Sequence, residues 1–355
     1  MQSIGVDIGK RNSQVSVRSE DGEEVLNLRL PTTARSLTDW FGAQPRSRVL
    51  IESCTAARWV KKLLESLSHE VVVADPNFLP MYVDAKNKRK KTDKRDASLL
   101  SQALIKDNWR PAHMRSEREQ TRKTQIDVRA RLVASRTKHI NGVRALFSQW
   151  GLEQSRCAPE HFVEKAVELA KSLGPELRQL AELELKAVKM FNAAIARLDK
   201  KIEKEARSNH DIALLASVPC VGPITATTFV ATVDDPTRFD DGHQLASYLG
   251  LAPSEMSSGE RRVIGHITKA GPKYLRSLLV QVAQTILRSK MSEARKLRTW
   301  GESLSTRRGK RIAIVALARK LAGVMLAIWK KKTSFDPLHG ETGQRLLQGS
   351  DGCVA

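Results

Sequence analysis

The chain has 355 residues, of which 41% are hydrophobic, so it is long enough for more than one domain with a buried core. Its 60 lysine and arginine residues against 39 aspartate and glutamate residues give a formal charge of +21, which favours nucleic acid as a partner over a merely soluble basic surface. Because no segment reads as a signal peptide, a membrane span or a CxxC pair, we expect a cytoplasmic protein whose four cysteines are reduced and mostly buried, without zinc or disulfides.

The N-terminal third alternates segments that are typical of strands and helices. Three successive strands are followed by alternating helix and strand, which is the order of a ribonuclease-H-like α/β domain with a mixed sheet flanked by helices. In that sheet the first and fourth strands are neighbours, so Asp7 and Glu52 at their ends are expected side by side. The predicted strands are Ser3–Asp7, Gln14–Arg18, Glu24–Leu30, Val49–Glu52 and Val71–Ala74, and the predicted helices are Thr32–Phe41 and Ala56–Ser68.

Acidic residues mark the ends of these segments. Asp7 ends the apolar run IGVD just before Gly9, Glu52 ends the fourth strand, and Asp93 and Asp96 stand three residues apart in KTDKRDA. Four converging carboxylates would suit a pair of hard divalent cations, magnesium or alternatively manganese, in two-metal phosphoryl transfer. Two structural interpretations stay open: Asp7 can be a solvated turn residue, and the other two acids can serve the dipole of a helix capped by Thr92.

A dense group of cations surrounds Asp93 and Asp96. A phosphate backbone that approaches the acids would meet these side chains first, so we expect them to bind nucleic acid. The alternative is a solvated basic loop. The group consists of Lys86, Lys88, Arg89, Lys90, Lys91, Lys94 and Arg95.

Two long helical stretches follow. The first, Glu117 to Trp150, is basic and is a second predicted contact with nucleic acid. The second runs from about Pro159 to Ser208 and carries an apolar seam with alternating spacings of three and four, broken at Glu184, which favours a coiled-coil arm over a globular core helix. The arm would pair with the first helix, a second subunit or both. The seam consists of Leu177, Ala181, Val188, Phe191, Ile195, Leu198 and Ile202.

The last third begins with LLASVPCVGPITA, residues 214–226, which resembles a helix-hairpin-helix whose turn presents N–H groups to phosphate. Cys220 stands where the first glycine of that hairpin would be, so a plain tight turn is the alternative. A short helix is predicted at Gln244–Leu251 and a polar loop at Ser254–Gly265.

A basic region lies around and after that loop. We expect nucleic-acid contacts from Arg261, Arg262, Lys269 and Lys273, the last two of which precede or begin a helix. A final helix at Arg311–Lys331 carries internal charges, which favour a packed amphipathic helix over a membrane segment. The residues after position 337 are expected to be disordered.

Six motifs in order carry a resemblance: GVDIGK, IES, KTDKRDA, VPCVGPITA, YLGLAPSEMSSGERR and ITKAGPKYLR. Together they resemble the DEDD transposases of the IS one-ten type of insertion sequence, recombinases guided by a structured bridge RNA. The resemblance implies a RuvC-like catalytic domain over residues 1–112, a helical coiled-coil region over 113–208, a mainly α-helical transposase domain over 209–336 and a tail over 337–355. It further implies a homo-oligomer, a dimer or tetramer, that acts on donor and target double-stranded DNA.

By position, the resemblance assigns metal binding to Asp7, Glu52, Asp93 and Asp96, and the role of nucleophile to Ser258. The neighbouring Ser257 is the alternative nucleophile. A serine hydroxyl needs activation before it attacks phosphorus, and the implied product is a covalent phosphoserine link to DNA. The bridge RNA would choose the sites by base pairing, so the protein would read mainly shape and backbone.

Other functions fit parts of the same pattern. A RuvC-like structure-selective nuclease would use the same acids with water as the nucleophile and would have no use for the serine motif. A DNA invertase of the same family would recombine DNA without moving an element of its own. A non-catalytic RNA-binding protein would explain the charge but not the four acids.

Overall fold

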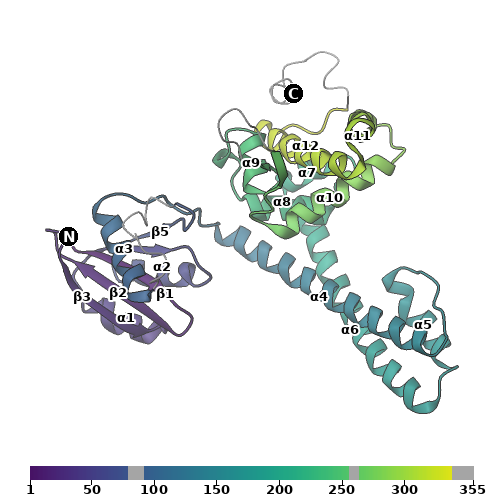
Figure 1. Cartoon of the computed structure of the whole chain (residues 1–355), viewed down its shortest axis with the longest axis horizontal. Coiled ribbons are helices and arrows are strands. Elements are labelled where there is room, and N and C mark those ends of the chain that lie inside the picture. Colours follow the sequence, from purple (N-terminus) through teal and green to yellow (C-terminus); the bar gives the residue numbers. More distant parts are fainter. Residues whose placement is uncertain (79–91, 256–263, 338–355) are drawn as a thin grey trace. The chain divides into compact units, whose positions relative to one another are not determined.

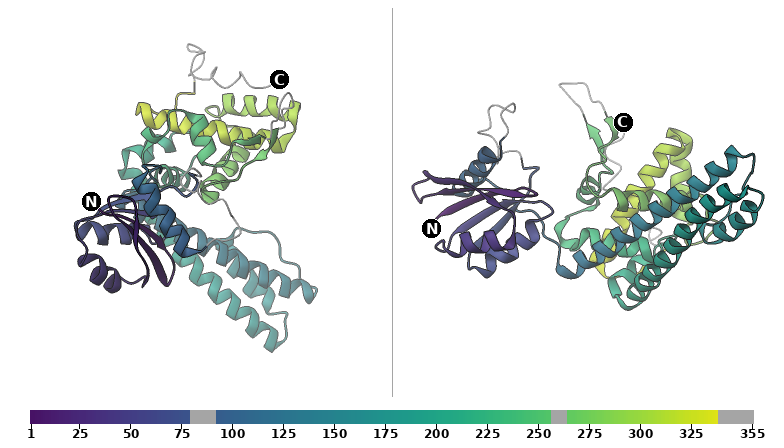
Figure 2. Two further views of the ribbon diagram at one scale, coloured as in Figure 1. Left: turned by 60° about the vertical axis from the view of Figure 1, so that its left-hand side comes forward. Right: turned by 90° about the horizontal axis from the view of Figure 1, so that it is seen from below.

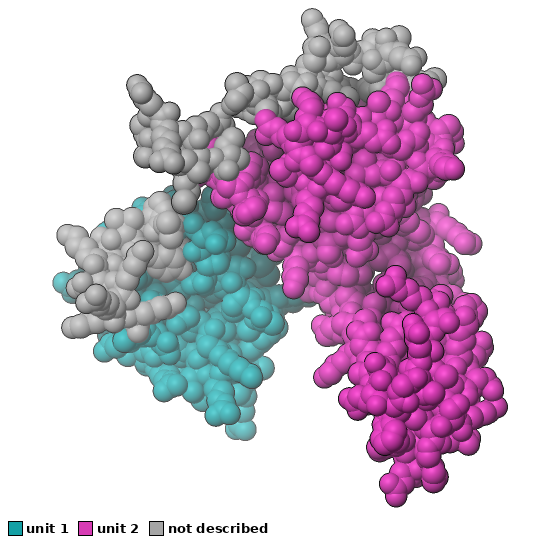
Figure 3. Space-filling view, turned by 45° about the vertical axis from the view of Figure 1, so that its right-hand side comes forward, with its two compact units in different colours: residues 1–115 teal, residues 116–355 magenta. Residues whose placement is uncertain are grey.

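The computed structural model describes residues 1–78, 92–255 and 264–337 (Figure 1). The chain divides into two compact units, residues 1–115 and residues 116–355 (Figure 3). Lys86, Lys88, Arg89, Lys90 and Lys91, as well as Ser257, Ser258, Arg261 and Arg262, lie outside the described residues, as does the predicted disordered tail.

The first unit is built on a five-stranded mixed sheet with the order β3-β2-β1-β4-β5. The antiparallel meander of β1, β2 and β3 continues into β4 and β5, which run parallel to β1. The predicted mixed sheet, with the first strand beside the fourth, is therefore confirmed. The strands are β1 Ser3–Ile8, β2 Asn12–Arg18, β3 Glu24–Pro31, β4 Arg48–Glu52 and β5 Glu70–Ala74.

Helices cover both faces of this sheet. The side chains of Val6 and Ile51 pack in one core with helices α1 (Ala34–Gly42) and α2 (Ala57–Ser66). On the opposite face, Leu50 packs against helix α3 (Asp93–Ile105). Gly5 permits this contact, because a Cβ atom there would come within 2.3 Å of the Ala97 carbonyl oxygen in α3. A glycine at this position of β1 thus fixes α3 directly on the sheet.

The second unit begins with an antiparallel pair of long helices, α4 (Glu117–Gln149) and α6 (Pro175–Ser208). The pair is joined at its far end by the short helices η2 (Pro159–His161) and α5 (Phe162–Ala170) (Figure 1). The single helical stretch predicted up to Ser208 is therefore interrupted by a turn at 171–174. Of the partners predicted for the arm, the first long helix is the one that the structure shows.

The seam of α6 differs from the predicted one. Phe191 and Leu198 are only partly buried. The face toward α4 instead includes Leu185, Asn192 and Asp199. These three alternate with Val188, Ile195 and Ile202 of the predicted seam, so the spacing of three and four continues without a break. Polar residues can occupy this face because arginines of α4 meet them: Arg136 donates to Asn192 and Arg129 to Asp199.

Most cations of α4 are likewise engaged inside the protein, so fewer of them are available to nucleic acid than the sequence predicts. The Arg122 side chain is only 1% exposed and is paired with Glu119 and Glu205. Lys123 pairs with Asp127. The remaining engaged cations are Arg129, paired with Asp199, Arg136, paired with Glu160, and Arg144, which lies over the Phe162 ring. Exposed cations on α4 include Arg118, Arg131 and Lys138.

The rest of the second unit is a helical domain with one core, formed by residues such as Phe229, Leu279, Leu321 and Met325. Residues 214–226 form two helices joined by a tight turn, and Cys220 in that turn has φ of +64°, the left-handed conformation that glycine adopts most readily. A two-stranded ribbon of β6 and β7 follows α9, so the ends of the predicted loop at 254–265 are strands (Figure 2). The elements are α7 His210–Ala216, α8 Pro223–Val233, η3 Pro236–Arg238, α9 Gly242–Tyr248, β6 Pro253–Glu255, β7 Ile264–Ile267, α10 Lys273–Arg288, α11 Arg295–Arg308 and α12 Lys310–Lys331.

Helix α12 is long and apolar enough to cross a membrane, and it is the one such helix in the described part of the chain. Half of it is buried inside the helical domain. Its internal charges also have protein partners: Arg319 donates to His243 at 2.7 Å, and the Lys320 ammonium lies 4.4 Å from the centre of the Trp300 ring. The predicted packed helix is confirmed.

The described cysteines are free, as predicted, but the expectation that they are mostly buried is wrong. Cys54 is exposed on the turn after β4, and Cys157 and Cys220 are partly exposed. Cys353 lies outside the described residues.

Candidate active site at the ends of β1 and β4

Two of the predicted catalytic acids occupy matching positions on neighbouring parallel strands. Val6 of β1 pairs with Ile51 of β4, and Asp7 and Glu52 are the next residues on each strand. Because side chains alternate along a strand, Asp7 shares the face of Gly5, and Glu52 shares the face of Leu50. Both positions belong to the face that α3 covers. The prediction that these two acids lie side by side is confirmed.

The first turn of α3 is held over the same face. The Thr92 hydroxyl caps the helix by accepting from the Arg95 N–H, as predicted. The Lys94 carbonyl accepts from Asn27 Nδ2 at 3.2 Å, and Asn27 Oδ1 accepts from Gln14 Nε2 at 2.7 Å. Gln14 in turn is the register partner of Asp7. Backbone and side-chain contacts therefore anchor the turn that bears Asp93 and Asp96 beside the strand that bears Asp7.

A polar network under α3 was not found by sequence reasoning. Ser16 shares a hydrogen bond of 2.8 Å with Ser101 of α3, and Arg18 donates to Ser98 and Ser101. Burial alone would raise the pKa of Glu24, but hydrogen bonds from Ser16 and Asn27 and the nearby charge of Arg18 outweigh it and lower that pKa. The sequence signal was the alternation in NSQVSVR, where every second residue of β2 is polar and faces the helix.

Asp7 and Glu52 lie on this face, and Asp93 and Asp96 belong to the helix that covers it, without forming a closed ligand cluster. Within residues 1–78, 92–255 and 264–337, no group of three histidine, cysteine or acidic side chains is close enough to hold a metal ion. Asp7, Glu52 and Asp96 are partly buried, whereas Asp93 is exposed. As a donor set, carboxylates suit magnesium or manganese. The structure thus brings two acids together and anchors the helix of the other two.

The described cations predicted to bind nucleic acid are placed as surface residues. Lys94 is exposed in the first turn of α3, and Arg95 is partly exposed. Lys269 and Lys273 are exposed at the approach to α10 and at its first residue.

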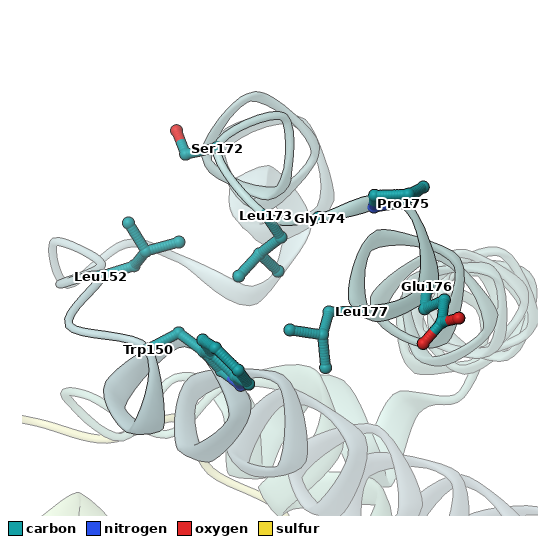
Figure 4. Close-up of a pocket in the computed structure, with 8 residues that line it drawn as sticks. All are labelled: Trp150, Leu152, Ser172, Leu173, Gly174, Pro175, Glu176 and Leu177. Carbon is teal, nitrogen blue, oxygen red and sulfur yellow. The ribbon is translucent and has the colours of Figure 1, made fainter.

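A cavity of about 380 Å³ is formed in the second unit, where α4 ends and α6 begins (Figure 4). None of the predicted site residues lines it. Its lining is mainly apolar and includes Trp150, which is exposed. The cavity is lined by Trp150, Leu152, Ser172, Leu173, Gly174, Pro175, Glu176 and Leu177.

Comparison with known proteins finds two family models along the chain. A model described as a transposase, of the DEDD type, matches residues 4–151, and the model of the transposase IS116/IS110/IS902 family matches residues 212–298. The first match contains the sheet, α3 and the four acids, and the second covers most of the helical domain.

Individual relatives extend over nearly the whole chain. A probable family 20 transposase of Pseudomonas aeruginosa is 31% identical over 345 residues, covering 95% of this chain and 99% of its own length. The transposase for insertion sequence element IS1111A of Coxiella burnetii is 28% identical and covers 94% of this chain and 90% of its own. A pilin gene-inverting protein of Moraxella bovis is 25% identical over 81% of each chain.

Proposed function

Because the chain belongs to the IS116/IS110/IS902 transposase family, we propose that it is a site-specific DNA recombinase that moves an insertion sequence, with a RuvC-like catalytic domain in its first unit. The observation that supports this most directly is the position of Asp7 and Glu52, each one residue beyond the last register pair of adjacent parallel strands, on the face covered by the anchored α3. That turn supplies Asp93 and Asp96.

The four acids are the proposed ligands of a divalent cation, magnesium or manganese. When bound, such an ion polarises a phosphate and stabilises the charge that develops during phosphoryl transfer. The protein's contribution is to hold carboxylates on one face, although they would repel one another without a cation. Gly5 and the network of Ser16, Arg18 and Ser101 fix α3, so that its acids are kept beside the sheet.

Ser258 is the proposed nucleophile. Its Oγ forms an ester bond to phosphorus while one P–O bond of the DNA backbone breaks, the serine loses its proton, and the departing sugar oxygen gains one. The number of phosphodiester linkages is unchanged, so the strands can be rejoined without an external energy source. We further propose that a structured bridge RNA selects donor and target DNA by base pairing and that the enzyme acts in the cytoplasm as a homo-oligomer, a dimer or tetramer.

A DNA invertase is the second candidate, and the similarity to the pilin gene-inverting protein of Moraxella bovis favours it. The proposed bond chemistry is the same in both. The difference lies in whether the recombined sites excise and insert an element or reverse a segment. A plasmid assay with sites in direct and inverted orientation separates the two activities.

The experiment that tests the proposal is covalent trapping. The full chain, with any copurifying RNA, is incubated with magnesium and a nicked DNA substrate carrying the junction sequences, so that the cleaved end diffuses away. A DNA adduct that survives denaturation is expected, and Ser258→Ala should lose both the adduct and recombination while retaining fold and binding.

Ser257→Ala is the matched control and should keep both products. Peptide mapping that placed DNA on Ser257 would move the nucleophile by one residue. Cleavage by the parent without any adduct, retained in the Ser258→Ala variant, would favour a nuclease that uses water.

A further inference from the structure

The helical pair sorts its charges between an inner and an outer side. The carboxylates of α6 that face α4 have partners there. Glu184 lies 2.5 Å from His139, Asp199 accepts from Arg129 at 3.1 Å, and Glu205 accepts from Arg122 at 2.6 Å. These acids therefore do little to offset charge on the far side of the helix.

The outer side of α6 is strongly basic between residues 186 and 207. At 3.6 residues per turn, the cations of this segment lie within an arc of about 120°. All of them are exposed, and none forms an ion pair within the described part of the chain; Glu203 borders them at one edge. We call this surface the α6 basic ridge. It consists of Lys186, Lys189, Arg197, Lys200, Lys201, Lys204 and Arg207.

Like charges within the ridge repel one another. Arg197 and Lys201, like Lys200 and Lys204, are like charges spaced i, i+4, which destabilises a helix by about 0.2–0.5 kcal/mol per pair. A surface with intermixed acids would avoid this repulsion. A bound polyanion relieves it, because each cation then faces a phosphate.

The length of the ridge fits a duplex. With a rise of 1.5 Å per residue, its ends are about 32 Å apart, which is close to the roughly 34 Å of one turn of B-DNA. We propose that the α6 basic ridge binds the phosphate backbone of double-stranded DNA, as a positioning surface outside the catalytic centre. Such contacts set orientation and register but carry no sequence information. The choice of DNA rests on the proposed recombinase function, whereas the polyphosphate chemistry rests on the ridge itself.

The test is the salt dependence of DNA binding by the full chain. Lys200, Lys201, Lys204 and Arg207 are replaced together by glutamine, which keeps long stems and good helix propensity. The matched control replaces four exposed cations near the tip of the same arm, where acids are intermixed, and lowers the net charge equally. It carries Arg156→Gln, Lys165→Gln, Lys171→Gln and Arg178→Gln.

All proteins also carry Asp7→Asn, so that cleavage does not interfere, and binding to a duplex of about 30 bp is followed by fluorescence anisotropy. Each phosphate contact contributes about 0.9 to the slope of log K against log salt. The ratio of parent to variant affinity should therefore fall about 3.5-fold per lost contact between 50 and 200 mM salt, and about 150-fold for four contacts. The tip variant should keep the parent slope.

A ridge variant with the slope of the tip variant would overturn the proposal, because the effect would then be one of net charge alone. A loss seen with duplex RNA but not with duplex DNA would overturn the choice of DNA. If circular dichroism shows that the quadruple variant loses helix, two double variants replace it: Lys200→Gln with Lys204→Gln, and Lys201→Gln with Arg207→Gln. For each, the ratio of parent to variant affinity should fall about 12-fold between 50 and 200 mM salt. This binding assay uses a cleavage-inactive chain and needs no strand transfer. Failure of the recombinase proposal would appear in the covalent-trapping experiment, separately from the binding result.

Discussion

Replacing Arg122 with methionine should destabilise the second unit more than any change of a surface arginine. The Arg122 side chain is 1% exposed and donates to Glu119, which is 10% exposed, and to Glu205, which is 27% exposed. Oε2 of Glu119 is buried without a hydrogen-bond partner in the described structure. Removing the guanidinium leaves an uncompensated carboxylate between α4 and α6, at a cost of about 3–5 kcal/mol in the free energy of unfolding.

The loss should depend on pH in a defined direction. Burial raises the pKa of Glu119 above its ordinary value of 4.5, and Arg122 only partly offsets this. A carboxyl whose folded pKa is raised stabilises the fold most below its unfolded pKa, and that stability is lost as pH rises through the folded pKa. Without Arg122 the pKa of Glu119 rises further. The difference in free energy of unfolding between the parent and Arg122→Met should therefore narrow as pH falls from 7.5 toward 4.5.

Urea unfolding followed by circular dichroism at 222 nm measures this gap at each pH. The matched control is Arg131→Met on the exposed side of α4, expected to stay within about 0.5 kcal/mol of the parent. Combining Arg122→Met with Glu119→Gln and Glu205→Gln should recover most of the loss, because no buried charge then remains unpaired. A loss below about 1 kcal/mol for the single change, or one that is the same at pH 7.5 and 5, would refute the role given to this triad.

Two further expectations concern the first unit. Asp7→Asn should abolish DNA cleavage in magnesium while leaving DNA binding largely intact, whereas Asp39→Asn on the exposed face of α1 should cleave normally; full cleavage by Asp7→Asn would remove this residue from the site. Replacing Lys88, Arg89, Lys90 and Lys91 by alanine should lower the salt slope of nucleic-acid binding by about 3.6 if all four contact phosphate, and an unchanged slope would make that segment a solvated loop.

The first unit could be predicted well because its signals are local. Strands of five to eight residues, with apolar residues that alternate or form one short run, specify their own lengths and order, and the order then places β1 beside β4. The proximity of Asp7 and Glu52 follows from the fact that β1 and β4 are neighbours. The network beneath α3 was missed because Ser16 and Arg18 look like ordinary solvent-facing residues of a strand until the helix that covers them is known.

How close the acids of α3 lie to the sheet could not be predicted from the sequence. Spacing of i, i+3 places Asp93 and Asp96 on one side of a helix, but the distance of that helix from the sheet depends on contacts of Gly5, Asn27 and Ser101. Those contacts join segments about 65 to 95 residues apart. Among the described residues no three possible ligands form a cluster. Acids placed at the same side of a sheet are therefore not necessarily close enough to bind one metal ion.

The second unit shows why counting cations along a sequence does not tell which of them lie free on the surface. Arg122, Arg129 and Arg136 recur every seven residues, a spacing that keeps them on one side of α4, toward α6. In the sequence of α4 alone, charges at those positions interrupt the apolar stripe of a packed helix. The sequence therefore predicts that these arginines face solvent.

The partners of these arginines, Glu205, Asp199 and Asn192, come some 55 to 85 residues later and in reverse order, which an antiparallel pair requires. Polar pairs of this kind can be satisfied in one alignment of the two helices, so they specify register where apolar contacts alone would tolerate a slip. The same pairing withdraws three arginines and two carboxylates from the surface of the arm. What stays outside is the α6 basic ridge, and the cations that bind nucleic acid should be sought among those that the protein itself leaves without a partner.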